Sequence, residues 1–398
     1  MTNRTINKIL VIEMFKSVKL TYNGCLLNGL ILNHDIPEDY FFHFKEFKEL
    51  FEKHSKYIYS IKLGTLSHLA LRFNLFENFN HIYRISIEKS KLNEACVVKV
   101  LQNLDSLQIL SIKNVIFVNF QQSCSDEEFK ETSHKLDKVT FSQVSLKHSN
   151  SQLCNYFKGC KYIKRLYLSN LDSDKLLKPF IFDKSLLSLS FHFNHSFNPT
   201  KIYGEILSSN SSITKLSLES KTLNQSDINQ IVDLLPHLKE LNLNALSENR
   251  SYYDQVIPEI EIFLKRNMEI NKLTLSHIQI SLQCLYNILS SLPCLEELEI
   301  TLGGKICRLA KVLSRSCPNL KYLAIKYIKS STLQNTDMDP VRELFDYYYN
   351  RSPILCAKKL KSLTLINMDI VKFFMFYMDQ YRNLDIFNFK QDFEEEMT

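Results

Sequence analysis

The pattern Leu-x-x-Leu-x-Leu, in which Ile, Val or Phe can replace Leu, recurs through most of this 398-residue chain. Its copies from residue 58 onward begin at Ile58, Ile82, Leu107, Leu136, Ile163, Leu186, Ile213, Leu238, Ile270, Leu295, Leu320, Leu360 and Leu384. Ten of the twelve intervals between them lie between 23 and 29 residues, and scattered aliphatic residues would not hold that spacing. A repeat of this length is typical of solenoids, in which each unit contacts only its neighbours.

Each repeat reads as a short strand followed by a return path. The apolar residues occupy the first, fourth and sixth motif positions, as in Ile213, Leu216 and Leu218. The fourth and sixth positions differ by two, the side-chain period of a strand, so both point to one face. Such a strand cannot bury its own apolar face, but a parallel sheet of aligned copies can share one core.

The return paths carry helical signals. Residues 226–236 place apolar residues at helical spacing between a candidate N-cap, Ser226, and Pro236, which cannot continue a helix. Residues 281–293 and 306–318 repeat this layout and also end at a proline. Parallel strands joined by helical crossovers predict an α/β solenoid. An ordinary α/β domain would also alternate strands and helices, but its strand and loop lengths would vary more.

The segments Cys317–Leu323 and Leu234–Leu243 resemble leucine-rich repeats, in particular those of ribonuclease-inhibitor-like and F-box-associated proteins. The resemblance covers about residues 58–390. It implies a curved leucine-rich repeat solenoid with a parallel sheet on the concave face and helices on the convex face. The usual Asn or Cys after the third Leu is mostly missing, and only Asn170, Asn244 and Asn367 come near that position. We therefore expect uneven curvature.

The repeat array is expected over residues 58–398, with insertions near 244–269 and 326–359 that are either surface elements or partner contacts. Residues 1–57 are expected to form an atypical N-terminal cap or a degenerate module. Leu27, Leu30 and Leu32 fit the strand motif there. An aromatic helical stripe, read as core rather than as a docking site, consists of Phe41, Phe44, Phe47 and Phe51.

Composition limits the class of partner and the compartment. The net charge of +6 is mild, and basic and acidic residues are interleaved, so charge alone does not favour a nucleic acid. No stretch of 18 apolar residues occurs, so no membrane span is expected. The ten cysteines form no Cys-x-x-Cys pair, and without a secretion signal they indicate reduced thiols. We expect a cytoplasmic protein, with the nucleus as the alternative.

Motifs for catalysis are absent from the sequence. The chain has seven glycines, no phosphate-binding glycine-rich loop, and no paired Cys/His metal spacing. Scattered histidines such as His192 are read as structural or solvated groups rather than bases. We expect no enzyme, no cofactor and no metal.

The strand period also predicts which side chains line the concave face. The third motif position contributes basic residues and the fifth mostly small hydroxyls such as Ser86, Ser111 and Thr140, which would leave free space for a partner. The later units change sign, with Glu297 and Glu299 followed by Tyr322 and Lys326. The candidate partner-binding residues are Arg84, Lys138, Arg165, Tyr167, Lys215 and Lys272. A basic row would favour a protein partner with an acidic surface, although an exposed strand face also carries polar residues for solubility alone.

The functional hypothesis is a non-enzymatic protein-interaction scaffold. The first alternative is an F-box-like substrate receptor of a ubiquitin ligase, in which residues 1–57 would dock the adaptor. A GTPase activator is the second alternative, although no diagnostic motif supports it.

Overall fold

The chain, in a computed structural model, forms two compact units, Met1–Leu189 and Ser190–Thr398. The structure describes residues 17–21, 24–27, 30–32, 55–64, 81–118, 135–146, 152–171, 176–181, 185–193, 200–220, 228, 233–245, 269–276, 281–303, 309–328, 359–367 and 384–390.

The first unit contains β1 (Ser17–Thr21), β2 (Gly24–Leu27), β3 (Leu30–Leu32), η1 (Ser55–Tyr57), β4 (Ser60–Leu63), β5 (Arg84–Asn93), α4 (Glu94–Gln102), β6 (Ile109–Val118), β7 (Lys138–Leu146), α5 (Gln152–Gly159), β8 (Arg165–Ser169) and α6 (Lys178–Ile181). Strand β9 (Ser188–Phe193) spans the boundary. The second unit continues with α7 (Thr200–Ser209), β10 (Lys215–Ser220), β11 (Glu240–Ala245), β12 (Lys272–Ser276), α9 (Leu282–Ser290), β13 (Glu297–Gly303), α10 (Leu309–Ser316), β14 (Tyr322–Ile328), β15 (Ser362–Ile366) and β16 (Ile386–Lys390).

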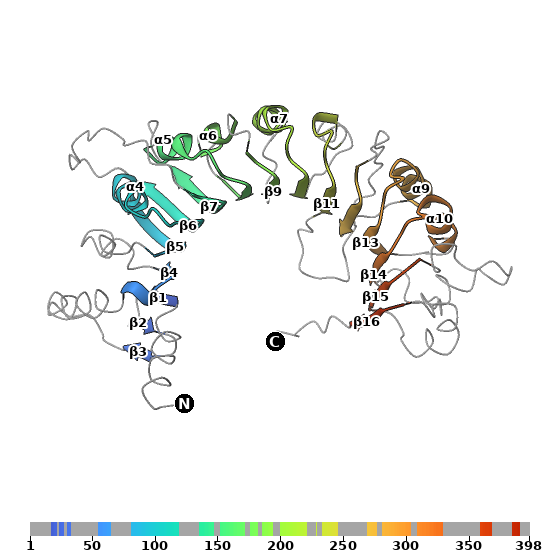
Figure 1. Ribbon diagram of the computed structural model, residues 1–398, viewed down its shortest axis with the longest axis horizontal. Coiled ribbons are helices and arrows are strands. Elements are labelled where there is room, and N and C mark those ends of the chain that lie inside the picture. Colours follow the sequence, from blue (N-terminus) through green and yellow to red (C-terminus); the bar gives the residue numbers. More distant parts are fainter. Residues whose placement is uncertain are drawn as a thin grey trace. The chain divides into compact units, whose positions relative to one another are not determined.

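Parallel strands in sequence order build most of the sheet of each unit (Figure 1). At the end of the first unit, β1 pairs in parallel with β4, and β2 and β3 follow β1 in antiparallel pairs. In the first unit β4 to β8 pair in parallel, and in the second β10 to β16 do so. Every strand from β4 to β16 begins two residues after a motif start read from the sequence; β6, for example, begins at Ile109 after Leu107. Leu241 and Leu273 are register partners in consecutive strands, as one shared repeat requires. The predicted α/β leucine-rich repeat solenoid is therefore confirmed.

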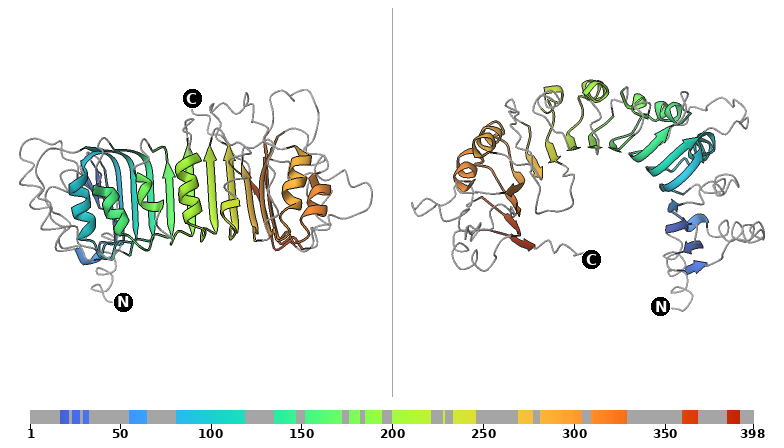
Figure 2. Two further views of the ribbon diagram at one scale, coloured as in Figure 1. Left: turned by 90° about the horizontal axis from the view of Figure 1, so that it is seen from above. Right: turned by 180° about the vertical axis from the view of Figure 1, so that it is seen from behind.

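The core of each unit lies between the sheet and the helices. Ile213, Leu216 and Leu218, at the first, fourth and sixth motif positions, are all buried, and the same positions are buried in the neighbouring repeats. In each unit the helices lie on one side of the sheet (Figures 1 and 2). Helix α9 begins where the sequence predicts, because the Ser281 hydroxyl accepts the Cys284 N–H at 3.1 Å.

Left-handed backbone recurs at the eighth motif position. Five non-glycine residues there have φ between 47° and 60°: Lys89, Asn114, Gln143, Asn170 and Asn367. In β6, Leu110 and Ile112 before this residue face the core, and Val115 and Phe117 after it do so too. Side chains of a strand alternate between the core and the open side, and the left-handed residue shifts this alternation by one residue, as a β-bulge does. The strand therefore continues past the turn with its apolar residues still in the core. The motif lacks a uniform Asn, but Lys and Gln adopt the same conformation.

A β-branched residue at this left-handed turn should destabilise the fold. We expect Asn114→Val to lower the free energy of unfolding by roughly 1–2 kcal/mol, because the left-handed conformation brings its Cβ close to the following carbonyl oxygen. Asn114→Gly should stay within about 0.5 kcal/mol of the wild type, because glycine adopts positive φ without that contact. Asn114 is exposed, so neither substitution removes core packing, and the difference between the valine and glycine variants reports on backbone conformation. Equal urea midpoints for the two variants would contradict the role of the turn.

One expectation needs correction. Leu27 ends β2, whereas Leu30 and Leu32 belong to β3, and β2 pairs antiparallel with both β1 and β3. These leucines therefore do not form one parallel repeat strand. Of the three asparagines near the usual Asn position, Asn170 and Asn367 form the left-handed turn, whereas Asn244 lies within β11 at the seventh motif position.

Several predicted features lie outside the described residues. They include the Phe41–Phe51 stripe and most of both insertions. The strands on either side of each insertion nevertheless pair directly, β11 with β12 and β14 with β15. The insertions therefore do not interrupt the sheet.

Candidate functional site

The sheet face opposite the helices, here called the open face, carries the third, fifth and seventh motif positions. Strand register aligns equivalent positions of successive repeats into rows across each unit. Neighbouring residues of a row lie about 4.8 Å apart, so their side chains can interact directly. Each candidate partner-binding residue belongs to one of these rows.

In the first unit, the third-position row brings three predicted residues together. It runs through Ser60, Arg84, Ile109, Lys138 and Arg165. Arg84 and Lys138 are exposed and take part in no ion pair with another described residue. These two cations are the most available basic groups of the row.

Arg165 and Tyr167, the strongest candidates from the sequence, differ in environment from Arg84 and Lys138. The Arg165 guanidinium binds Asp137, with the Nε atom 3.0 Å from Oδ2 and a second contact from Nη2 to the same oxygen. Asp137 occupies the second motif position of the preceding repeat, directly before Lys138. Tyr167 lies in the fifth-position row beside Thr140 and is half-buried. The positive charge of Arg165 is therefore compensated within the chain.

In the second unit, the third-position row alternates in charge. Register places Lys215, Glu240, Lys272 and Glu297 side by side. The Lys215 Nζ lies 2.7 Å from Glu240 Oε2, and the Lys272 Nζ lies 2.7 Å from Glu297 Oε2. The expectation of a basic row fails at this point, because each lysine has a glutamate partner in the next strand and the charges cancel.

Three glutamates, Glu297, Glu240 and Glu299, act on the charge of Lys272. Its hydrogen bond to Glu297 raises the pKa of the ammonium above the usual range, although burial opposes that shift. The charges of Glu297, Glu240 and Glu299 act in the same direction. Lys272 therefore stays protonated, and its charge is neutralised by the ion pair with Glu297 of the same chain.

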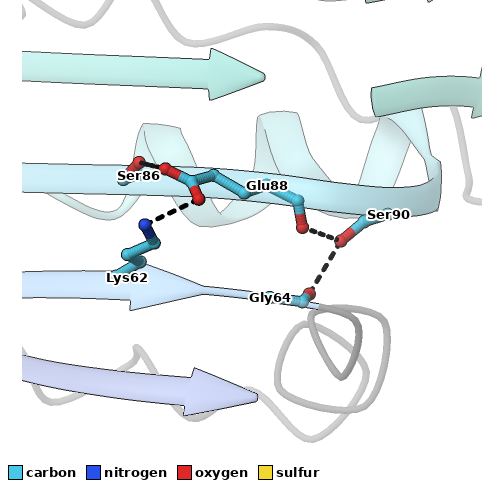
Figure 3. Close-up of polar contacts among 5 residues, drawn as sticks. All are labelled: Lys62, Gly64, Ser86, Glu88 and Ser90. Atoms are coloured by element: carbon cyan, nitrogen blue, oxygen red, sulfur yellow. Dashed lines mark hydrogen bonds and ion pairs between the residues drawn. The ribbon is translucent and has the colours of Figure 1, made fainter. Parts of the chain in front are cut away.

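Glu88 organises a second polar cluster on β4 and β5 (Figure 3). Its carboxylate lies 2.6 Å from the Lys62 Nζ and accepts a hydrogen bond from the Ser86 hydroxyl at 3.2 Å. Burial alone would raise the pKa of Glu88, but Lys62, Ser86 and Lys113 together outweigh it and hold the pKa below the usual range. Ser90 follows the left-handed Lys89, and its hydroxyl lies 2.7 Å from the Gly64 carbonyl just beyond β4.

The small hydroxyls do not leave an open floor throughout. Ser86 and Ser111 are each only 8% exposed, so the expectation of free space above them is wrong. At Ser86, the longer Glu88 side chain of the seventh-position row reaches the hydroxyl and accepts its hydrogen bond.

A depression of about 110 Å³ lies on the open face of β12 to β15 in the second unit. Its lining includes Lys272, Glu297, Glu299, Tyr322 and Ala324. Of the candidate partner-binding residues, only Lys272 lines it, and Glu297, Glu299 and Tyr322 were predicted to lie on this face but not to form a site. The signal for it was the small residue Ala324 at a fifth position where its neighbours are larger.

His192 belongs to a polar row at the seventh motif position. Its Nδ1 lies 2.5 Å from Glu219 Oε2, and Asn244 Nδ2 donates to Glu219 Oε1 at 2.9 Å. The interpretation of His192 as a structural group fits this row.

In the described parts of the chain, no group of three or more His, Cys, Asp or Glu side chains is placed to hold a metal ion. None of the described helices has the length and apolar character needed to cross a membrane.

Comparisons with known proteins return no matching family model and no matching curated protein. Among solved structures, an internalin from Listeria monocytogenes (InlF) aligns at 13% identity and a TM-score of 0.40, covering 84% of this chain and 86% of its own. TLR13, solved as a complex with ssRNA13, aligns at 14% identity and a TM-score of 0.40, covering 85% of this chain. This chain spans 54% of the length of the TLR13 chain. The assignment of this chain to the leucine-rich repeat fold rests on its own strand register and buried rows.

Proposed function

We propose that this chain is a non-enzymatic protein-interaction scaffold that binds a partner protein on the open face of its sheet. The observation that supports this most is the asymmetry of the sheet. One face is buried beneath the described helices, while the other presents rows of polar side chains. Loops and faces that a rigid scaffold presents to solvent are where binding residues usually lie.

The charge distribution supports a protein partner of mixed charge. Arg84 and Lys138 suit acidic groups of a partner in the first unit. In the second unit the paired lysines and glutamates cancel, which does not favour the continuous basic surface that binding a phosphate backbone needs.

No observation favours the ubiquitin-ligase alternative. An adaptor-docking module in residues 1–57 would be helical in the related-looking proteins, whereas β1, β2 and β3 occupy part of this segment. In repeat proteins that resemble this one, GTPase activation uses a positioned Arg or Asn. Of the two candidate arginines, Arg165 is engaged by Asp137, and no observation assigns this role to Arg84.

Charge reversal on the open face tests the proposal. We expect Arg84→Glu/Lys138→Glu in the full chain to reduce proximity labelling of the specific partners in the native cell by about tenfold, because like charges would then face the acidic groups of the partner. Both residues are exposed, so the melting temperature should change little.

The matched control reverses two exposed lysines on the helices of the same unit, Lys99→Glu/Lys158→Glu. This variant should label the same proteins as the wild type. If the open-face variant also labels the wild-type set in full, the first unit does not bind through these residues.

A further inference from the structure

The depression on β12 to β15 exists because the fifth-position row contains one small residue. Ala324 is the register partner of Glu299 on one side and of Thr364 on the other. Its single methyl group forms a low floor between these longer side chains, and Tyr322 stands two residues earlier on the same face of β14. The resulting volume of about 110 Å³ is well below the roughly 300–1,000 Å³ of a typical small-molecule site. It suits the end of one side chain.

The charges around the floor leave one carboxylate available. Glu297 is held by Lys272 at 2.7 Å. Glu299 is exposed, and among the described residues it makes no hydrogen bond or ion pair; its effect on its own chain is the field that it exerts on Lys272. The charged residues that line the depression are Lys272, Glu297 and Glu299, so its lining has one negative charge in excess.

An aromatic ring lines the same depression as Glu299, one row away. Tyr322 is 41% exposed and is the register partner of Glu297 in the third-position row. A ring face beside a carboxylate favours a cation, because the ring quadrupole and the negative charge attract the same group. A planar guanidinium can stack on the ring and donate two hydrogen bonds to a carboxylate, which an ammonium cannot do.

We infer that the depression formed by Glu299, Tyr322 and Ala324 receives a cationic side chain, preferably arginine, of the partner protein. This rests on the proposed function and adds a specific contact in the second unit. The guanidinium binds the Glu299 carboxylate, its methylene stem lies over Ala324, and Tyr322 covers one side. The partner therefore presents a basic residue here.

The test uses the full chain with ¹³C-labelled alanine and threonine methyl groups and the probe peptide acetyl-Gly-Arg-Gly-amide. We expect saturable shifts of the Ala324 and Thr364 methyl signals with a dissociation constant of the order of 10 mM, since one exposed ion pair and one cation–π contact are each weak.

The peptide in which neutral citrulline replaces arginine should bind about fivefold more weakly or not at all. Glu299→Gln should abolish the shifts. The matched Glu205→Gln change on the exposed surface of α7 should preserve them.

Shifts that persist unchanged in Glu299→Gln, or equal shifts with the citrulline peptide, would overturn the proposal. Proximity labelling with Glu299→Lys separates this failure from a failure of the proposed function. If Glu299→Lys retains every specific partner while Arg84→Glu/Lys138→Glu loses them, the open face binds a partner but this depression does not. If Glu299→Lys loses a partner that Glu205→Lys retains, the depression contributes to binding.

Discussion

Replacing Phe141 by alanine is expected to lower the free energy of unfolding by about 3–5 kcal/mol, the largest effect of any single change considered for this chain. Phe141 occupies the sixth motif position of β7 and is fully buried. Its removal leaves a cavity that the neighbouring strands cannot close, because Ile112 and Leu168 are fixed beside it by the parallel register. The lost transfer free energy and the cavity therefore add.

The rings around Phe141 increase this cost. Its centroid lies 5.3 Å from that of Phe157 in α5, with the rings nearly perpendicular at 89°, and 6.3 Å from that of Phe180 in α6. Phe157 and Phe180 are 5.6 Å apart. Edge-to-face aromatic pairs contribute roughly 0.5–1.5 kcal/mol beyond the area that they bury. Phe141 thus connects one strand to the helices of two consecutive repeats.

The measurement is urea unfolding followed by far-ultraviolet circular dichroism, because the chain contains no tryptophan. Tyr162→Ala is the control in the same unit. Tyr162 is 58% exposed, and its removal should change stability by less than about 0.5 kcal/mol. Hydrogen exchange should show the loss of protection first in β6, β7 and β8, since a repeat contacts mainly its neighbours. If Phe141→Ala were as mild as Tyr162→Ala, the packing assigned to this repeat would be wrong.

The fold could be predicted because the repeat of the Leu-x-x-Leu-x-Leu motif determines which side chains are buried. The first, fourth and sixth motif positions are buried in every repeat from Ile58 to Leu365, and each of their strands begins two residues after a motif start. The left-handed turn at the eighth position was harder to predict. Lys89 and Gln143 adopt it without the side chain that usually marks it, because the bulged ladder on both sides fixes the backbone.

The candidate site was predicted less well than the fold. The strand period placed Arg84, Lys138 and Arg165 in one row correctly. It could not show whether each charge was compensated, because that depends on which residue the register places alongside. Lys215 and Lys272 read as basic residues in their own repeats, but Glu240 and Glu297 of the following repeats neutralise them. Reading the third position across repeats, rather than within each, would have revealed the alternation.

The depression depends on a property that the pattern does not encode. The relative lengths of neighbouring side chains decide where a sheet face has a depression. Ala324 is shorter than its row neighbours Glu299 and Thr364, and the hydrophobic pattern of the motif carries no information on that difference. The chemistry there also differs from that of the first unit. A basic row suggested an acidic partner surface, whereas Glu299 and Tyr322 suit a basic residue. A partner that contacts both units would need groups of both signs.

The second large effect is expected at Glu94, a buried carboxylate that connects two helices. Glu94 is the first residue of α4 and is 3% exposed, and its Oε1 accepts the N–H of Leu153 at 2.6 Å. Leu153 lies in the first turn of α5, where backbone N–H groups have no partner within the helix and a negative charge is favoured. Glu94→Ala should lower the free energy of unfolding by about 1–3 kcal/mol, because the buried N–H loses its acceptor.

Glu94→Gln separates hydrogen bonding from charge. Its amide oxygen can still accept the Leu153 N–H, so we expect the loss to be roughly 1 kcal/mol smaller than for alanine, the remainder being the interaction of the charge with the N-terminus of α5. Glu205→Ala and Glu205→Gln on α7 provide the exposed controls, and both should stay within about 0.5 kcal/mol of the wild type. Urea unfolding measures all four variants. If the alanine and glutamine variants at residue 94 are equally destabilised, the hydrogen bond contributes nothing beyond the charge; if both match the controls, Glu94 does not connect α4 to α5.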